Sequence, residues 1–158
     1  MAGDPEVSRV IDIRVDDESW RSIAVDHLVG ECCAAARAAA PALDGSVSFL
    51  FTDDAAMKTL NASFRDVDKP TNVLSFPSGD AAQAFLGDVA LGFETCARQA
   101  ADGGVALADH AAHLIVHGLL HLVGYDHQTD DDAGVMEKLE VRILAQLGVN
   151  NPYEGCDE

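Results

Sequence analysis

Five of the six histidines of this chain lie between His110 and His127. The core of this stretch reads HGLLHLVGYDH and runs from His117 to His127. His117 and His121 are four residues apart, so on a helix both imidazoles project from one face. Two imidazoles placed in this way can bind one zinc ion at about 2.0–2.1 Å each. The pair therefore indicates a metal site carried on a helix.

A third ligand must come from beyond the helix, because the helix carries the residues that follow past the ion. Gly124 can adopt a positive φ and end the helix, which allows the chain to fold back. A fourth protein ligand, from Cys96 or Asp126, would close a structural site, whereas an open catalytic site keeps water there. The alternative is a group of partly buried histidines without a metal, but the glycine break favours one zinc per chain. The predicted ligands are His117, His121 and His127.

The neighbouring histidines have other predicted roles. His113 precedes His117 on the same stripe, but it lies eight residues from His121, roughly 12 Å along a helix. One ion would not easily reach both, so we interpret His113 as a residue that packs behind or supports the ligands. Asp126 can orient a ligand histidine through its second ring nitrogen. His27 and His110 are interpreted as surface or capping residues.

Gly118 follows the first histidine of the motif directly. Metalloproteases of the HExxH type place a glutamate at that position as the general base. Peptide hydrolysis of that kind therefore loses its main support. A zinc hydrolase of another substrate, such as a peptide or a small amide, stays as an alternative hypothesis.

A second motif, NASFRDVDKPTNVLSFP, spans residues 61–77 and holds two of the ten basic residues. These are Arg65 and Lys69, which we place in a connecting segment. Arginine can hold a phosphate through two parallel hydrogen bonds. The alternative is a pair of solvated charges balanced by Asp66 and Asp68. The pattern by itself favours the solvated charges.

Hydrophobic periodicity predicts the elements that must position these residues. The apolar residues of 107–123 recur at helical spacing over much of the circumference, which indicates a buried central helix. Ser19 is expected to cap the first helix. The predicted strands are 7–15, 46–51, 72–76 and 86–91, and the predicted helices are 19–39, 54–63, 94–101, 107–123 and 130–147.

Four strands interleaved with helices predict an α+β fold with a mixed sheet covered by helices. The chain shows no repeat or linker, so we expect a single domain over 1–158, with 1–6 and 154–158 as loose ends. The composition of 48% apolar residues excludes disorder. The first ten residues show no secretory signal, and no apolar run could span a bilayer. We therefore expect a cytoplasmic protein with reduced cysteines, in which Cys32 and Cys33 are buried on a helix.

The net charge of −17 argues against broad electrostatic attachment to nucleic acid or to anionic membranes. It does not argue against a small basic site or a bound cation. We expect no membrane and no DNA as partners.

The two motifs together resemble the YbeY family of bacterial endoribonucleases that mature ribosomal RNA. The segments LGDVAL and MEKLE also fit that family in order and spacing. The resemblance runs from about Ser46 to Tyr153. It implies a zincin-like single domain whose sheet packs around a central histidine-bearing helix. It also implies that the three motif histidines bind zinc and that Arg65 is the catalytic or phosphate-binding residue.

The activity that the resemblance implies is zinc-dependent cleavage of single-stranded RNA. The role would be maturation of the 3′ end of small-subunit ribosomal RNA and ribosome quality control, with small-subunit ribosomal proteins and an Era-type GTPase as partners. His117 and Arg65 would then serve catalysis, and Lys69 would help to position the RNA backbone. The alternative is a non-catalytic ribosome-assembly factor with a structural zinc. No general base is evident, and either water or the 2′-hydroxyl could attack.

Overall fold

The computed structural model describes residues 10–78, 85–125 and 129–153. The predicted loose ends, 1–6 and 154–158, lie outside this part of the chain. The strands are β1 (Ile11–Val15), β2 (Ser46–Thr52), β3 (Val73–Pro77) and β4 (Phe85–Gly92). The α-helices are α1 (Val25–Ala39), α2 (Asp54–Arg65), α3 (Phe93–Gly103), α4 (Leu107–Leu122) and α5 (Asp130–Gln146), and two short 3-10 helices are η2 (Glu18–Ser22) and η3 (Pro41–Leu43).

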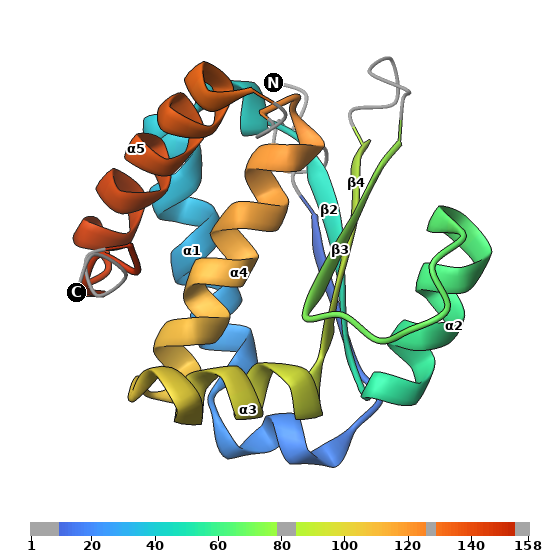
Figure 1. Cartoon of the computed structure of the whole chain (residues 1–158). Coiled ribbons are helices and arrows are strands. Elements are labelled where there is room, and N and C mark those ends of the chain that lie inside the picture. Colours follow the sequence, from blue (N-terminus) through green and yellow to red (C-terminus); the bar gives the residue numbers. More distant parts are fainter. Residues whose placement is uncertain (1–9, 79–84, 126–128, 154–158) are drawn as a thin grey trace.

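The four strands form one mixed sheet in the order β1-β2-β4-β3. β1 pairs with β2 and β2 with β4 in parallel, whereas the edge strand β3 runs antiparallel to β4. Figure 1 shows α1, α4 and α5 on one side of the sheet and α2 on the other. The predicted α+β class with a mixed sheet is confirmed.

The main hydrophobic core fills the space between the sheet and α1, α4 and α5. Alternate residues of β2 point into it, among them Val47, Phe49 and Phe51, while Ser48 and Leu50 face α2. This alternation is the expected consequence of the two-residue period of a strand. Cys32 and Cys33 are free and buried in the same core, as predicted, and Cys96 is free and buried there as well.

The predicted helix over 19–39 is wrong in its first part. The chain forms the short helix η2, passes through an extended Ile23 and starts α1 at Val25. Trp20 causes the break, because its side chain is fully buried and its indole Nε1 donates a hydrogen bond to the Thr52 carbonyl at 2.9 Å. The cap is also different: the Asp17 side chain accepts from the backbone N–H of Ser19.

The remaining boundaries differ by a few residues. Of the first predicted strand, residues 11–15 are confirmed and 7–9 lie outside the described residues. The predicted place of Arg65 in a connecting segment is wrong, because α2 extends to Arg65 and this arginine is the last residue of the helix. Asp66 follows in the left-handed region and ends α2. Lys69 does lie in the connection to β3.

Within the described residues, no single helix is long and apolar enough to cross a membrane. Only α3 and α4 taken together meet those criteria, and they are bent by 116° with respect to each other.

Gly118 determines how closely α4 approaches the sheet. A Cβ added at this position would lie 2.8 Å from Val89 Cγ1 and 3.1 Å from Ser75 Oγ. The hydroxyl of Ser75 donates a hydrogen bond to the Gly118 carbonyl at 3.1 Å. Any side chain here would push the helix away from β3 and β4. A glutamate at this position, as in the HExxH enzymes, is therefore incompatible with this packing.

We expect Gly118→Ala to lower the free energy of unfolding by about 1–3 kcal/mol, because the added methyl overpacks a close contact. Gly30→Ala is the matched control. Gly30 lies within α1, and an added Cβ there would meet nothing within 4 Å. The control should raise the free energy of unfolding by about 0.5–1 kcal/mol through lower backbone entropy in the unfolded chain. Urea unfolding measures both, and equal effects of the two variants would contradict the packing role of Gly118.

Candidate metal centre

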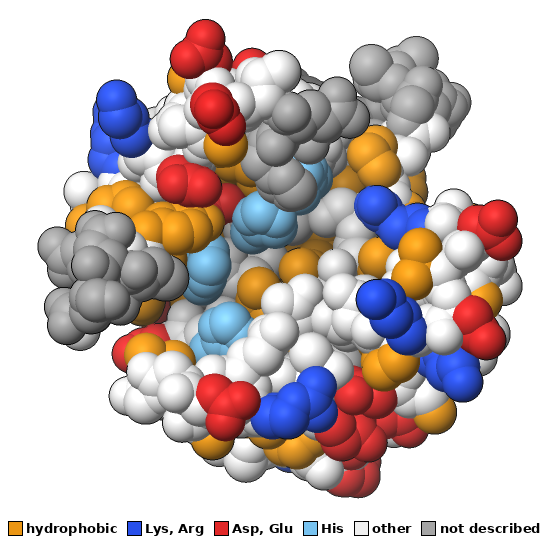
Figure 2. Space-filling model, viewed as in Figure 1, with side chains coloured by type: hydrophobic (Ala, Val, Ile, Leu, Met, Phe, Trp, Pro, Cys, Tyr) orange, Lys and Arg blue, Asp and Glu red, His pale blue; other side chains and the backbone are white. Residues whose placement is uncertain are grey.

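The histidines of α4 follow one another along a single face of the helix. His113, His117 and His121 are partly exposed, while residues on the other faces, such as Ile115 and Leu119, are buried. Ring centroids lie 6.2 Å apart for His113 and His117 and 4.6 Å apart for His117 and His121. Figure 2 shows histidine side chains gathered along a hollow in this face of the molecule.

His117 and His121 have the geometry of two ligands of one metal ion. Their Nε2 atoms lie 3.1 Å apart. Two nitrogens bound tetrahedrally to zinc at 2.0–2.1 Å would be separated by about 3.3 Å. The imidazoles are therefore already close to the arrangement that a shared ion requires.

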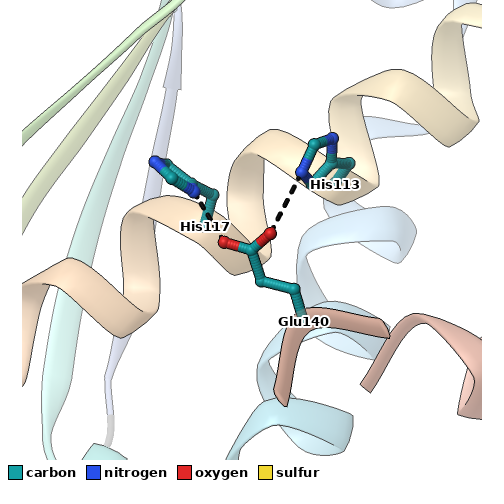
Figure 3. A group of neighbouring side chains, drawn as sticks. All are labelled: His113, His117 and Glu140. Carbon is teal, nitrogen blue, oxygen red and sulfur yellow. Dashed lines mark hydrogen bonds and ion pairs between the residues drawn. The ribbon is translucent and has the colours of Figure 1, made fainter. Parts of the chain in front are cut away.

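Glu140 lies behind this pair, on α5, and its side chain is fully buried. Its Oε2 accepts a hydrogen bond from His117 Nδ1 at 2.6 Å, and its Oε1 accepts one from His113 Nε2 at 3.2 Å (Figure 3). The Tyr153 hydroxyl also donates to Oε1. Burial by itself raises the pKa of this carboxyl, but the bonds from His113, His117 and Tyr153 outweigh it and lower the pKa to about 2.

An ionised Glu140 determines which ring nitrogen of His117 is available. A carboxylate only accepts hydrogen bonds, so Nδ1 of His117 must carry the proton. The neutral ring then keeps its lone pair on Nε2, which faces His121. Metal-binding histidines commonly use this arrangement, in which a carboxylate holds the nitrogen that does not bind the ion.

A second grouping of possible ligands shares His117. His113, His117 and Glu140 each offer one ligand atom, and these three atoms lie within 4.8 Å of one another. These residues could therefore hold a metal ion. In that grouping Glu140 would exchange its two imidazole hydrogen bonds for the ion. The Nε2 pair needs no such rearrangement, and on this physical ground we favour it.

Two predicted site residues, Asp126 and His127, lie outside the described residues. Cys96, considered as a fourth ligand, is fully buried on α3, where its thiol donates to the Asn72 carbonyl at 3.6 Å. Burial, with a smaller contribution from Asp54, raises the pKa of that thiol to about 12. His27 is exposed beside Glu31, and His110 is half-buried with its Nε2 2.9 Å from Gln99 Oε1.

Arg65 is tied to the same region through the edge strand. Its Nη2 donates to the Ser75 carbonyl at 3.3 Å, and the Ser75 hydroxyl in turn contacts the residue after His117. The acids that follow Arg65 do not form its partners in the described part of the chain. Asp68 lies 4.0 Å from Lys58, and Asp66 ends α2. Lys69 is exposed, and its backbone carbonyl accepts from Asn61 Nδ2 at 2.9 Å.

Sequence reasoning missed Glu140 and Tyr153. A signal for Glu140 is present in the sequence, because it shares the apolar stripe of α5 with Met136, Ile143 and Leu144, all of them buried. A glutamate at a core position of an amphipathic helix requires a partner. Tyr153 follows the last helix, and nothing in its local pattern indicates the contact with Glu140.

Comparison with known proteins gives one consistent result. A family model described as Endoribonuclease YbeY matches residues 10–148. A curated protein of that name from Jannaschia sp. (strain CCS1) is 49% identical over 158 residues, covering 90% of this chain and 99% of the relative. Its counterpart from Dinoroseobacter shibae is 44% identical over 170 residues, covering 96% and 94%.

A solved structure shares the fold. The solution structure of TM1509 from Thermotoga maritima superposes with a TM-score of 0.59 at 21% identity, covering 92% of this chain and 95% of that chain.

We expect Glu140→Gln to weaken Zn²⁺ binding about 10- to 100-fold, because an amide no longer holds His117 in one tautomer as strongly. Competition with a chromophoric chelator measures the affinity. Glu137→Gln makes the same charge change at an exposed position of α5 and should leave the affinity unchanged. Equal loss in both variants would mean that only the overall charge matters.

Proposed function

This chain belongs to the YbeY family of endoribonucleases, and on that premise we propose that it cleaves single-stranded RNA at a zinc site on α4. The reaction is hydrolysis or transesterification of a phosphodiester bond during ribosomal RNA maturation. One observation carries the choice of site: the two Nε2 atoms of His117 and His121 lie 3.1 Å apart, and a buried carboxylate holds the back of His117. His127 is proposed as the third ligand.

A bound zinc ion supplies Lewis-acid polarisation of a phosphoryl oxygen and lowers the pKa of water. The chain's own residues provide the rest. Glu140 holds His117 in place from behind, and His113 bonds the other oxygen of the same carboxylate. Asp126 is proposed to support another ligand in the way that Glu140 supports His117. Arg65 offers a guanidinium that can form two hydrogen bonds to a phosphate. Its charge would stabilise the negative charge that develops on the phosphorus oxygens in the transition state.

Arg65 is suitably placed for that role. It lies at the end of α2, exposed, and one of its nitrogens bonds a backbone carbonyl. That bond uses one of the five N–H donors of the group, which leaves others for a substrate. Lys69, four residues further along the chain, is proposed to contact the RNA backbone as a point charge.

We extend the proposal to the wider context by family resemblance. The wider proposal includes a zincin-like fold and a single domain over the whole chain. Its proposed partners are small-subunit ribosomal proteins and an Era-type GTPase. The proposed processing site is the 3′ end of the small-subunit RNA, and the proposed location is the cytoplasm. The packing of α4 at Gly118 supports a nuclease over an HExxH-type peptidase, because it leaves no space there for a glutamate base.

Arg65→Ala is expected to lower kcat on single-stranded RNA about 100-fold or more, because charge stabilisation in the transition state is lost. His117→Ala should reduce cleavage to background. Arg21→Ala is the control: this arginine is also exposed, it pairs with Glu18 at 3.2 Å, and it lies on η2. Its activity should equal that of the wild type. Equal cleavage by all four proteins would assign the activity to a contaminant.

Removal of the metal by EDTA should abolish cleavage and leave the far-UV circular dichroism unchanged. The reason is that the main core is built from apolar side chains that need no ion. Re-addition of Zn²⁺ should restore activity. Cooperative unfolding on chelation would instead favour the structural-zinc alternative, since a structural ion contributes folding free energy directly.

A further inference from the structure

The face of the sheet opposite the histidines is only partly covered. Helix α2 packs on it through Met57 and Leu60, next to Leu74 and Ala90. Toward the end of α2 the cover stops, and a groove of about 850 Å³ opens between the helix and the strands. Its lining includes apolar residues of α2 and β3 and polar residues of β1, β2 and β4. The volume lies in the range of small-molecule sites.

Phe64 is the most unusual residue of this groove. It lines the wall, yet 68% of it is exposed. Its ring meets that of Phe76 edge-on, with centroids 5.2 Å apart and planes at 62°. A large ring so exposed costs hydrophobic free energy unless something covers it in the working state. The open face of a fixed phenyl ring is what single-stranded nucleic acids use as a stacking platform.

The charges of the groove favour a base over a phosphate as its occupant. Asp12 and Asp88 lie in the lining, and of its two arginines, Arg14 is paired with Asp16 at 2.8 Å. Carboxylates repel phosphate but accept hydrogen bonds from the amino and imino groups of bases. Burial raises the pKa of Asp88, so its carboxylate gains from such a donor.

Arg65 connects the groove to the metal centre. It belongs to the lining, directly after Phe64, and it also bonds Ser75 of the edge strand. Ser75 contacts Gly118 on the other side of that strand. A strand of RNA whose phosphate is held by Arg65 could therefore place the neighbouring base on Phe64.

We propose that this groove binds one nucleobase of single-stranded RNA next to the cleaved phosphate, stacked on Phe64. The inference rests on the proposed function and adds a subsite to it. The sugar–phosphate backbone stays at the rim with Arg65, and the acidic floor receives the polar edge of the base.

The test combines a protein change with a substrate change. A 12-nucleotide RNA is prepared with a single abasic residue at each position in turn, and kcat/KM is measured for wild type and Phe64→Ala. For wild type, the abasic residue at one or two positions beside the cleavage site should lower kcat/KM about tenfold, the effect of losing one stacked base. Phe64→Ala should lower kcat/KM on intact RNA by a similar factor. On those abasic substrates, the kcat/KM of Phe64→Ala should equal that of the wild type.

Val67→Ala is the matched control, because Val67 is exposed at 36%, three residues further along, and outside the groove lining. It should behave as wild type on every substrate. If the fold losses in kcat/KM from Phe64→Ala and from the abasic residue multiply, the subsite is refuted. It is also refuted if the kcat/KM of the wild type stays unchanged at every position of the abasic residue. An effect of Phe64→Ala that is the same on all substrates would point to a structural or protein-binding role.

A direct binding measurement separates this subsite from the proposed function. Phe64→Trp places an exposed indole in the groove, while the natural Trp20 is fully buried. Single-stranded RNA should quench the new emission, and an oligomer of equal charge without bases should not. If RNA quenches the Phe64→Trp variant but the wild type does not cleave RNA, the subsite is supported and the nuclease activity is refuted. If the wild type cleaves RNA but the variant is not quenched, the subsite is refuted and the nuclease activity is supported.

Discussion

The close contact of α4 with the sheet at Gly118 is the constraint on which the rest of the site depends. Because this residue has no side chain, the helix approaches Val89 and Ser75 closely. That close contact sets the distance between α4 and the sheet, and so the position of α4 relative to α5. From that position His117 reaches Glu140 on one side, and Ser75 links the helix to Arg65 on the other. The candidate metal centre and Arg65 are thus connected through the packing of one glycine.

A buried carboxylate is the second essential feature. Taking Glu140 out of water costs several kcal/mol unless the charge is fully hydrogen-bonded. Three donors from His113, His117 and Tyr153 satisfy it. The bonds that make the burial tolerable include the one that sets the tautomer of His117. One interaction therefore serves both the stability of the core and the orientation of a proposed metal ligand. A hydrophobic residue at this position would pack as well but would leave the imidazole free to turn.

The features that could be predicted from the sequence are those that depend on a local hydrophobic period, namely helices, strands and the faces that they present. The helix over 107–122 and the shared face of its histidines follow from a spacing of three or four residues, and the strands follow from alternation. The break at Ile23 could not be predicted in this way, because it depends on Trp20 inserting beneath Thr52, 32 residues away. Glu140 and Tyr153 were missed for the same reason. Their role exists only after α5 packs against α4, although the glutamate on an apolar stripe indicated that something must pair with it.

The net charge of −17 shapes how such a protein can recognise a polyanion. Repulsion between exposed charges fades beyond a Debye length of about 8 Å at physiological salt, so short-range contacts can still operate at the surface. Arg65 and a bound cation would neutralise few phosphates, and the salt dependence of binding scales with that number. Affinity must therefore come from contacts that carry no net charge. Stacking on an exposed ring is one such contact, and it requires unpaired bases, which selects single strands over duplexes. On the proposed function, the acidic body would discourage attachment to bulk RNA, and recognition would rest on the proposed metal site, Arg65 and the bases beside them.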